Sequence, residues 1–289
     1  MFTDSISSLI TGLPVAAVSI KAQPLEFASW LTNSIFVGLL VAGGITLFVR
    51  RGMKGATLVP NRQQNLVELI VEFLYNQVVG IVGEKVAPRA FPLLATIFVF
   101  VLFSNWFGLL PGVGTIGWDT HHADYLSIAH VHTPLLRPAT ADLNMTLAMA
   151  LIFMIVWVYI TYKEVGVIGF IKHTFGAKGG LTGIMGLLIS FIFLCVGLIE
   201  LVSIAFRPVS LSLRLLGNIY AGETLLHTML TLGEKLGLGP VLSFITSIAF
   251  PVPFYFMEIL VGFLQAMVFA LLCAVYIRLS ATHEEGDAH

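Results

Sequence analysis

Two charged residues, Arg214 and Glu223, interrupt an apolar segment that is otherwise suited to a lipid bilayer. A charged side chain near the bilayer centre costs roughly 2.5–3.5 kcal/mol on insertion scales, so such residues are rare and usually functional. Glu223 follows Arg214 by nine positions, which on a helix places it about 180° around the axis and roughly 13 Å further along. The two charges therefore cannot form a local ion pair, and each needs a partner of its own.

The neighbours of the two charges differ in kind. On the predicted helix, Arg214 shares its face with small and neutral residues, namely Ser210, Gly217, Asn218 and Ala221. Glu223 has His227 one turn further along its own face, at a spacing that brings side chains together. The sequence predicts a bare cation facing outward from the helix and a carboxylate with a titratable neighbour on the opposite side.

The segment PVSLSLRLLGNIYAGE, residues 208–223, closely resembles the signature of the a subunit of F-type ATP synthases. In that family the arginine matching Arg214 faces the carboxylate of the rotating ring of c subunits. The residues matching Asn218 and Glu223 belong to the family's proton path. The resemblance covers most of residues 30–285, including RPATADLNMT at residues 137–146, and is most specific in the last third.

The resemblance implies a proton-translocating stator subunit that has no catalytic site, cofactor or metal of its own. Its expected partners are the c-subunit ring, the b subunits of the peripheral stalk, the remainder of the ATP synthase and membrane lipid, in a bacterial inner membrane. Arg214 is then the residue that separates two half-channels. The residues expected along the proton path are Asn105, Asp142, Asn144, Glu200, Asn218, Glu223, His227, Glu258 and Gln265.

The expected mechanism follows from the order of these residues along the chain. Glu200 lies toward the cytoplasm, whereas Glu223, Glu258 and Asp142 lie toward the outside. A guanidinium stays charged and does not relay protons, so Arg214 keeps the two sides apart. A ring carboxylate beside Arg214 is favoured in its ionised form, and in lipid it must be neutral. Gln265 is expected to hydrogen-bond Arg214 and hold its planar group in place.

This chain departs from the family at one point. Many members have a histidine and an acid at the positions of Glu223 and Glu258, whereas this chain has two acids and keeps its histidine at His227. Two nearby carboxylates raise one another's proton affinity, which favours a protonated form for at least one of them.

Composition supports a membrane protein. Of 289 residues, 57% are hydrophobic and only 11% are charged, which places the chain in the polytopic class. A net charge of −1 and scattered basic residues argue against nucleic acid as a partner. No glycine-rich loop of the Walker type is present in the sequence. Two other classes stay open at this point: a secondary transporter that binds an anionic substrate through Arg214, and a structural scaffold.

Hydrophobic runs predict an all-α fold with five membrane crossings, the last two long, strongly tilted and paired as a hairpin. The family resemblance implies that this hairpin lies against the ring. The crossings are expected at residues 27–49, 90–110, 143–162, 181–231 and 241–279. Residues 60–83 form an amphipathic helix at the cytoplasmic interface, with an apolar stripe of Leu66, Leu69, Ile70, Phe73 and Leu74. Basic residues after the first span place segment 1–26 outside, loop 111–141 outside and tail 280–289 in the cytoplasm.

Several polar residues have a structural explanation as well as a functional one. Asn105 is either a hydrogen-bonding contact between helices or part of a hydrated path. Asp142 is either a helix cap or a residue through which protons enter. Glu200, Glu223 with His227, and Glu258 with Gln265 are also compatible with contacts between helices. The outer loop carries His121, His122, His130 and His132, whose spacing matches no strong metal-ligand motif.

Overall fold

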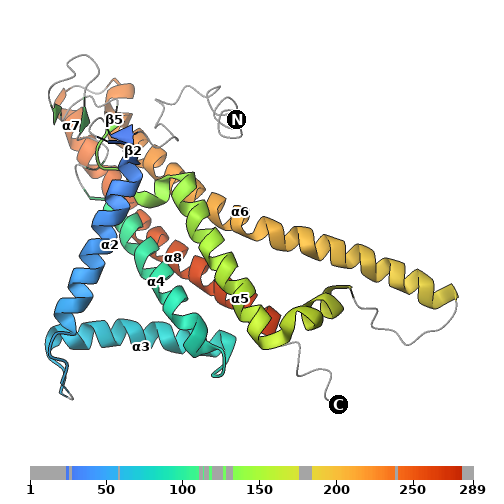
Figure 1. Cartoon of the computed structure of the whole chain (residues 1–289). Coiled ribbons are helices and arrows are strands. Elements are labelled where there is room, and N and C mark those ends of the chain that lie inside the picture. The colour runs from blue at the N-terminus through green and yellow to red at the C-terminus, as the bar shows by residue number, and fades with distance from the viewer. Residues whose placement is uncertain are drawn as a thin grey trace. The chain divides into compact units, whose positions relative to one another are not determined.

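The computed structural model describes the chain except for residues 1–23, 26–27, 58, 111–112, 114–116, 119–125, 128–132, 176–183, 238–239 and 282–289. Its main elements are the helices α2 (Asn33–Gly52), α3 (Arg62–Val82), α4 (Ala87–Gly108), α5 (Leu143–Phe175), α6 (Ile184–Lys235), α7 (Pro240–Ala249) and α8 (Pro251–Ala281) (Figure 1). A short 3-10 helix, η1 (Ala139–Ala141), precedes α5. The predicted all-α polytopic membrane fold is confirmed.

Within the described residues, six helical segments are long and apolar enough to cross a membrane by length and composition. They are Asn33–Gly52, Arg62–Val82, Ala87–Gly108, Leu143–Lys163, Phe191–Leu230 and Leu242–Leu279. Five of them coincide with the predicted crossings, and the sixth is α3, which the sequence predicts to lie along the interface. The count of five crossings stays a prediction.

In the part of the chain that the structure describes, five short strands accompany the helices, and the sequence pattern predicts none of them. β1 (Pro24–Leu25) pairs antiparallel with β2 (Ala28–Thr32), and β3 (Gly117–Trp118) pairs antiparallel with both β4 (Leu126–Ser127) and β5 (Thr133–Pro134). Because β2 occupies the start of the first predicted span, its boundary at residue 27 is wrong. The helix begins at Asn33, where the Thr32 hydroxyl accepts a hydrogen bond from the Ile35 amide at 3.3 Å and caps the first turn.

Helix α3 leaves most of its apolar stripe exposed and buries another face. Asn61 caps its start by accepting a hydrogen bond from the Gln64 amide at 2.8 Å. Its buried residues are Gln64, Val67, Leu74, Val78 and Val82, so Leu74 alone of the predicted apolar stripe is buried. The other four apolar residues of that stripe are exposed. An apolar stripe in a membrane protein can face lipid as well as the protein core, which is why it did not identify the buried face.

Helix α5 continues past its predicted end at residue 162 to Phe175, with a break at Gly166, whose φ of 74° is unfavourable for other residues. Helix α6 has 52 residues, which is about 78 Å of continuous helix. The prediction of one long helix rather than two is confirmed, although Pro208 lies inside it and not at its start.

The predicted last helix is in fact two. Phe250 separates α7 from α8, because Pro251 lacks an amide hydrogen and disfavours helical geometry in the residue before it. Small residues at four-residue spacing form a ridge on α8 that is buried throughout, at Gly262, Ala266, Ala270 and Ala274. Small side chains in such a ridge let a neighbouring backbone come close.

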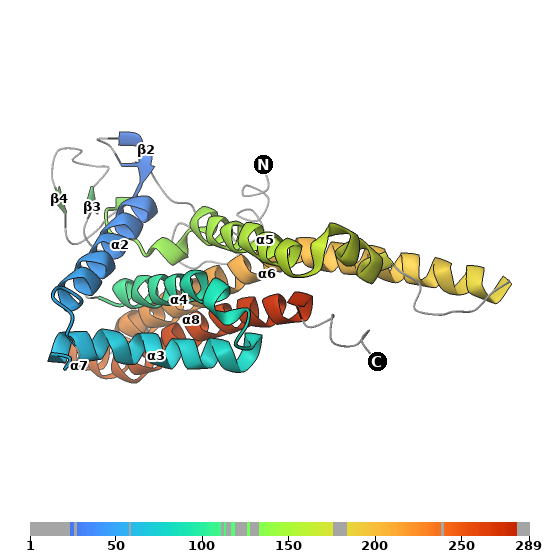
Figure 2. The ribbon, with the colours of Figure 1, turned by 60° about the horizontal axis from the view of Figure 1, so that its bottom comes forward.

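The contacts divide the chain into two compact units, which are described separately. The first unit contains residues 1–51, 99–146 and 213–266, and the second contains residues 52–98, 147–212 and 267–289. In the first unit α4 lies beside α8, as Figure 2 also shows, and the Trp106 indole donates a hydrogen bond to the Ile259 carbonyl at 3.1 Å. In the second unit Trp157 donates to the Tyr276 carbonyl at 2.9 Å.

Candidate functional site

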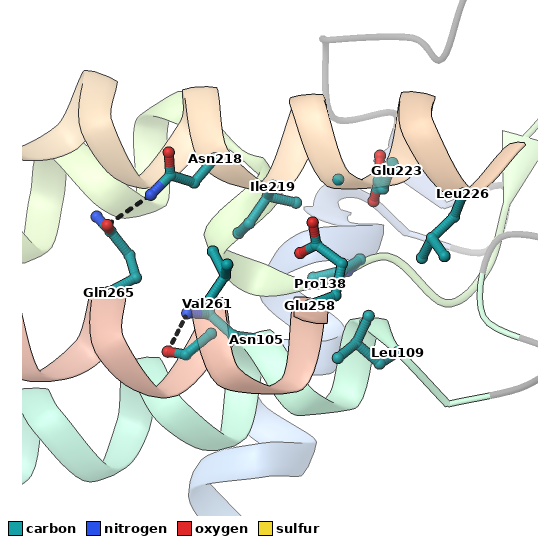
Figure 3. Close-up of a pocket in the computed structure, with 13 residues that line it drawn as sticks. Asn105, Leu109, Pro138, Asn218, Ile219, Glu223, Leu226, Glu258, Val261 and Gln265 are labelled. Atoms are coloured by element: carbon teal, nitrogen blue, oxygen red, sulfur yellow. Dashed lines mark hydrogen bonds between the residues drawn. The ribbon is translucent and has the colours of Figure 1, made fainter. Parts of the chain in front are cut away.

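A pocket in the first unit gathers polar residues from three helices (Figure 3). Its volume is about 50 Å³, enough for about three water molecules. The predicted site residues that line it are Asn105 from α4, Asn218 and Glu223 from α6, and Glu258 and Gln265 from α8. Most of the remaining wall is apolar or glycine: Gly108, Leu109, Pro138, Ile219, Gly222, Leu226, Val261 and Gly262. Five residues that are up to 160 positions apart in the sequence thus meet in one cavity.

Two amides join α6 to α8 at one end of this pocket. The Asn218 amide donates to Gln265 Oε1 at 2.6 Å, and Gln265 is 5% exposed. The predicted hydrogen bond between Gln265 and Arg214 is wrong: Gln265 is buried and accepts from Asn218 instead, whereas Arg214 lies on an exposed face of α6. The spacing of seven residues between Glu258 and Gln265 places both on one face of α8, as the pocket shows, but spacing along one helix cannot identify the partner on α6.

Asn105 fixes α4 against α8 and also lines the pocket. Its Nδ2 donates to the Gly262 carbonyl at 3.2 Å, and its Oδ1 accepts from the Thr140 hydroxyl at 2.8 Å. Gly262 permits this approach, since a Cβ there would lie 3.3 Å from Cβ of Asn105. The predicted role of Asn105 as a contact between helices is therefore confirmed. Its predicted role in a hydrated path stays a prediction, and its place in the pocket wall is compatible with it.

The two predicted carboxylates approach one another across the pocket from opposite helices. Figure 3 shows the Glu258 side chain reaching from α8 toward α6, on which Glu223 lies. Both are half-buried. The approach depends on Gly222, since a Cβ at this position would overlap the Glu258 carboxylate. The absence of a side chain at Gly222 is thus what admits a carboxylate between the two helices.

Arg214 is not part of the pocket wall and lies instead on an exposed face of α6. Its exposed neighbours on that face are Ser210, Leu213, Gly217 and Ala221. This confirms the outward cation with small residues beside it, apart from Asn218, which is half-buried and turned toward Gln265. We call this set, residues 210, 213, 214, 217 and 221, the arginine stripe.

A buried turn before α5 carries two more charged groups. Asp142 is 4% exposed and accepts a hydrogen bond from the Asn144 amide at 3.0 Å, which confirms its predicted role as a helix cap. Burial raises the pKa of the Asp142 carboxyl, although the Asn144 amide and the charge of Arg137 act to lower it. Asn144 itself is exposed.

Arg137, which the sequence did not single out, is the second charged group of this turn. It is 7% exposed and donates to the Ala141 carbonyl at 3.3 Å. Burial lowers the pKa of the Arg137 guanidinium, while the charges of Glu223 and Asp142 raise it. The only sign of Arg137 in the sequence is an arginine next to Pro138 in a segment of small residues. Because it lies outside every hydrophobic run, its charge has no apparent cost of insertion into the membrane.

The remaining predicted site residues lie apart from the pocket wall. His227 is exposed, one turn beyond Glu223 on α6. Glu200 belongs to the second unit and is half-buried. In that same unit Arg207, seven residues after Glu200, lies over the rings of Trp157 and Tyr276 at 5.5 and 4.4 Å from their centroids. The four histidines of the outer loop lie outside the described residues.

A family model described as the ATP synthase A chain matches residues 31–278. The chain therefore belongs to the ATP synthase A chain family. The ATP synthase subunit a of Protochlamydia amoebophila (strain UWE25) is 28% identical over 288 residues, covering 98% of this chain and 94% of that protein. The subunit a of Pseudomonas fluorescens strain Pf-5 is 34% identical over 277 residues, covering 92% and 88%. That of Gluconobacter oxydans (strain 621H) is 32% identical over 249 residues, covering 85% and 86%.

Membership of the A chain family also gives the function. Its members are the proton-translocating subunits of the membrane sector of the ATP synthase, and proton translocation is the function of this chain. Nothing in the structure or the family supports the alternative of a secondary transporter. The pocket and the arginine stripe are accordingly the two features from which we argue how this chain moves protons.

Proposed function

We propose that the pocket is the outer half of a divided proton path and that Arg214 separates it from an inner half. The observation that carries this proposal is the position of Arg214 one turn before Asn218, the residue that closes the pocket toward Gln265. Carboxylates can take up and release protons, and amides can hold water between them. A guanidinium can bind water but neither releases nor accepts a proton, so a proton path that ends at Arg214 stops there.

Glu223 and Glu258 carry protons through the outer half in this proposal, with Asp142, Asn144 and His227 near its mouth. Asn105, Asn218 and Gln265 orient the water between them, and the cavity volume of about 50 Å³ leaves room for it. Glu200, on the part of α6 that belongs to the second unit, serves the inner half. A proton can then cross only on a carrier that moves past Arg214.

The carrier is a carboxylate of the c-subunit ring, docked on the exposed face of α6. Support comes from the arginine stripe, whose Ser210, Gly217 and Ala221 let another helix come close to the arginine. Only 11% of an 18-residue apolar stretch within residues 191–230 of α6 is buried within the chain. A helix that contributes so little to its own fold, and that carries a charge on its exposed face, has the properties of an interface with a partner in the membrane.

The other proposals concern the assembly around this chain. The b subunits of the peripheral stalk hold it as part of the stator, and it has no catalytic site, cofactor or bound metal, so that nucleotide chemistry takes place on other subunits. It lies in a bacterial inner membrane with its N-terminus outside and its C-terminus in the cytoplasm. The basic residues Arg50 and Arg51 in the last turn of α2 and Lys54 just after it support this orientation.

The test compares Arg214→Lys and Arg214→Ala in inverted membrane vesicles. Lysine keeps the charge but loses the planar group and loses its proton more readily when buried, so both variants should abolish ATP synthesis. In vesicles stripped of the catalytic head, the alanine form should also leak protons, because the two halves then communicate. Glu223→Gln and Glu258→Gln should slow proton flux without a leak, and the double variant should lose more than either. An Arg214→Ala form that synthesises ATP at the normal rate would refute the proposal.

A further inference from the structure

A buried turn at the wall of the pocket presents one arginine to the carboxylates. Residues 137–142 are all buried, and Pro138 of this turn lines the pocket together with Glu223 and Glu258. Two contacts from α4 hold the turn in place. The Thr140 hydroxyl donates to Asn105 Oδ1 at 2.8 Å, and Gly108 meets Pro138 so closely that a Cβ at Gly108 would lie 2.5 Å from its Cγ.

The side chain of Arg137 is fixed by the same turn. Its Nη2 donates to the Ala141 carbonyl at 3.3 Å, four residues along the chain. From this position the guanidinium interacts electrostatically with Glu223 of α6 and with Asp142 at the start of α5. Glu223 in turn interacts with Glu258 of α8. A single guanidinium thus interacts with two carboxyls, Glu223 and Asp142, and the first of these also interacts with Glu258.

We infer that Arg137 is a positioning residue for Glu223, whose fixed positive charge allows one carboxylate of the outer path to be ionised; this inference rests on the proposed function. A carboxylate that relays protons must alternate between a neutral and a charged form. The charged form is costly in an apolar wall unless an opposite charge lies nearby. The rigid turn supplies that charge at a constant place, which a mobile side chain on a helix surface would not.

The charge balance around Glu223 shows why one arginine matters here. The titratable groups of the first unit on the elements packed around it are Asp142, Tyr220, His227, Tyr255 and Glu258, in addition to Arg137, the outward-facing Arg214, and Glu234 and Lys235 at the C-terminal end of α6. Residues 99–108 of α4 and residues 33–49 of α2 carry no titratable side chain. Glu223 and Glu258 are both acids, so the cation that interacts with Glu223 is Arg137 of the turn.

The experiment compares Arg137→Gln with Arg137→Lys by the pH profile of proton-driven ATP synthesis in sealed inverted vesicles. Without the positive charge the carboxylates hold their protons to higher pH, so the profile of Arg137→Gln should move upward by about one pH unit. Arg137→Lys keeps the charge and should keep the profile near its normal position, at a reduced rate. Arg62→Gln, an exposed arginine at the start of α3, is the matched control and should leave the profile unchanged.

A purely structural role predicts a different result. If Arg137→Gln assembles and loses rate without a shift of the profile, the inference is overturned, while the proposed function stands as long as Glu223→Gln slows proton flux. If Glu223→Gln leaves the flux unchanged, the proposed function itself fails. Should Arg137→Gln fail to assemble, assembly of the Arg137→Gln/Glu223→Gln double variant supports a charge pair, and its failure overturns the inference in favour of a role in folding.

Discussion

Replacing Gly222 by alanine should impair proton transfer while leaving the helix as stable as before. A Cβ at Gly222 would stand 2.5 Å from Oε2 of Glu258, whereas ordinary contacts of a Cβ begin at 3.4 Å. The carboxylate must therefore retreat by about 1 Å, and a displacement of about 1 Å in a reacting group can cost up to about 100-fold in rate. We expect proton-driven ATP synthesis to fall by about 10- to 100-fold.

The stability of the protein should not explain this loss. Alanine is favoured over glycine in a helix by about 1 kcal/mol, and the group that it displaces is the end of a flexible side chain. The thermal unfolding temperature of Gly222→Ala should accordingly equal or exceed that of the wild type. Gly44→Ala is the matched control, because a Cβ at Gly44 on α2 meets nothing within 4 Å; it should leave synthesis unchanged.

A second substitution makes the steric argument specific. Glu258→Asp shortens the side chain by one methylene and withdraws the carboxylate from the space that the new Cβ occupies. The double variant Gly222→Ala/Glu258→Asp should therefore lose less than the product of the two single losses, as coupling between contacting residues requires. Synthesis at the wild-type rate by Gly222→Ala would show that the carboxylate need not occupy this position, and the reasoning would fail.

Four further outcomes follow from the contacts of the fold. Asn105→Leu removes the hydrogen bonds to Gly262 and Thr140 and should lower the free energy of unfolding by about 1–2 kcal/mol; Thr140→Val in the same background should restore part of it, and a lack of coupling in thermal unfolding would contradict the contact. Burial raises the pKa of Asp142, so the carboxyl destabilises the fold increasingly as pH rises above its ordinary value. Asp142→Asn should therefore gain unfolding temperature relative to the wild type from acid toward neutral pH, and a difference that is constant with pH would count against this. Arg207→Lys loses stacking on Trp157 and Tyr276 and should cost about 0.5–2 kcal/mol of stability, whereas Lys85→Gln, at an exposed lysine after α3, should not, and equal unfolding temperatures for the two would refute the stacking. Cysteine at Leu236 should react with an impermeant thiol reagent from outside and cysteine at Lys54 only from the cytoplasm, so labelling of both from one side would contradict the proposed orientation.

The sequence predicted the helices well because the physical signal for them is strong. A long apolar run is costly anywhere except in a membrane or a core, so the cores of α2, α4, α5 and α6 were recognisable by length alone. The ends were less certain, as at Thr32, where a capping hydroxyl and a short strand set the boundary. The strands have two to five residues, too few for a periodic pattern to emerge.

Site residues could be predicted from the sequence where a charged residue interrupts an apolar segment, but not where the packing between helices determines the contacts. Arg214 and Glu223 were identified because a charge in an apolar helix has a large cost. The bond from Asn218 to Gln265 depends on how α6 and α8 pack, and spacing along one helix cannot give it. Arg137 and Gly222 act through burial and close approach, and neither property is visible before the helices are in place.

The hydrogen bond between the two amides of the pocket also has a direction. Because Asn218 donates to Oε1 of Gln265, the polar group of Gln265 that is still available is its Nε2. This nitrogen is buried and has no partner among the described residues. This nitrogen can only donate. A water molecule bound there must offer it a lone pair and turn both of its own hydrogens away, toward acceptors such as carboxylate oxygens. The amide pair would thus fix the direction in which a water molecule bound at Gln265 Nε2 points its hydrogens, before any carboxylate changes its charge.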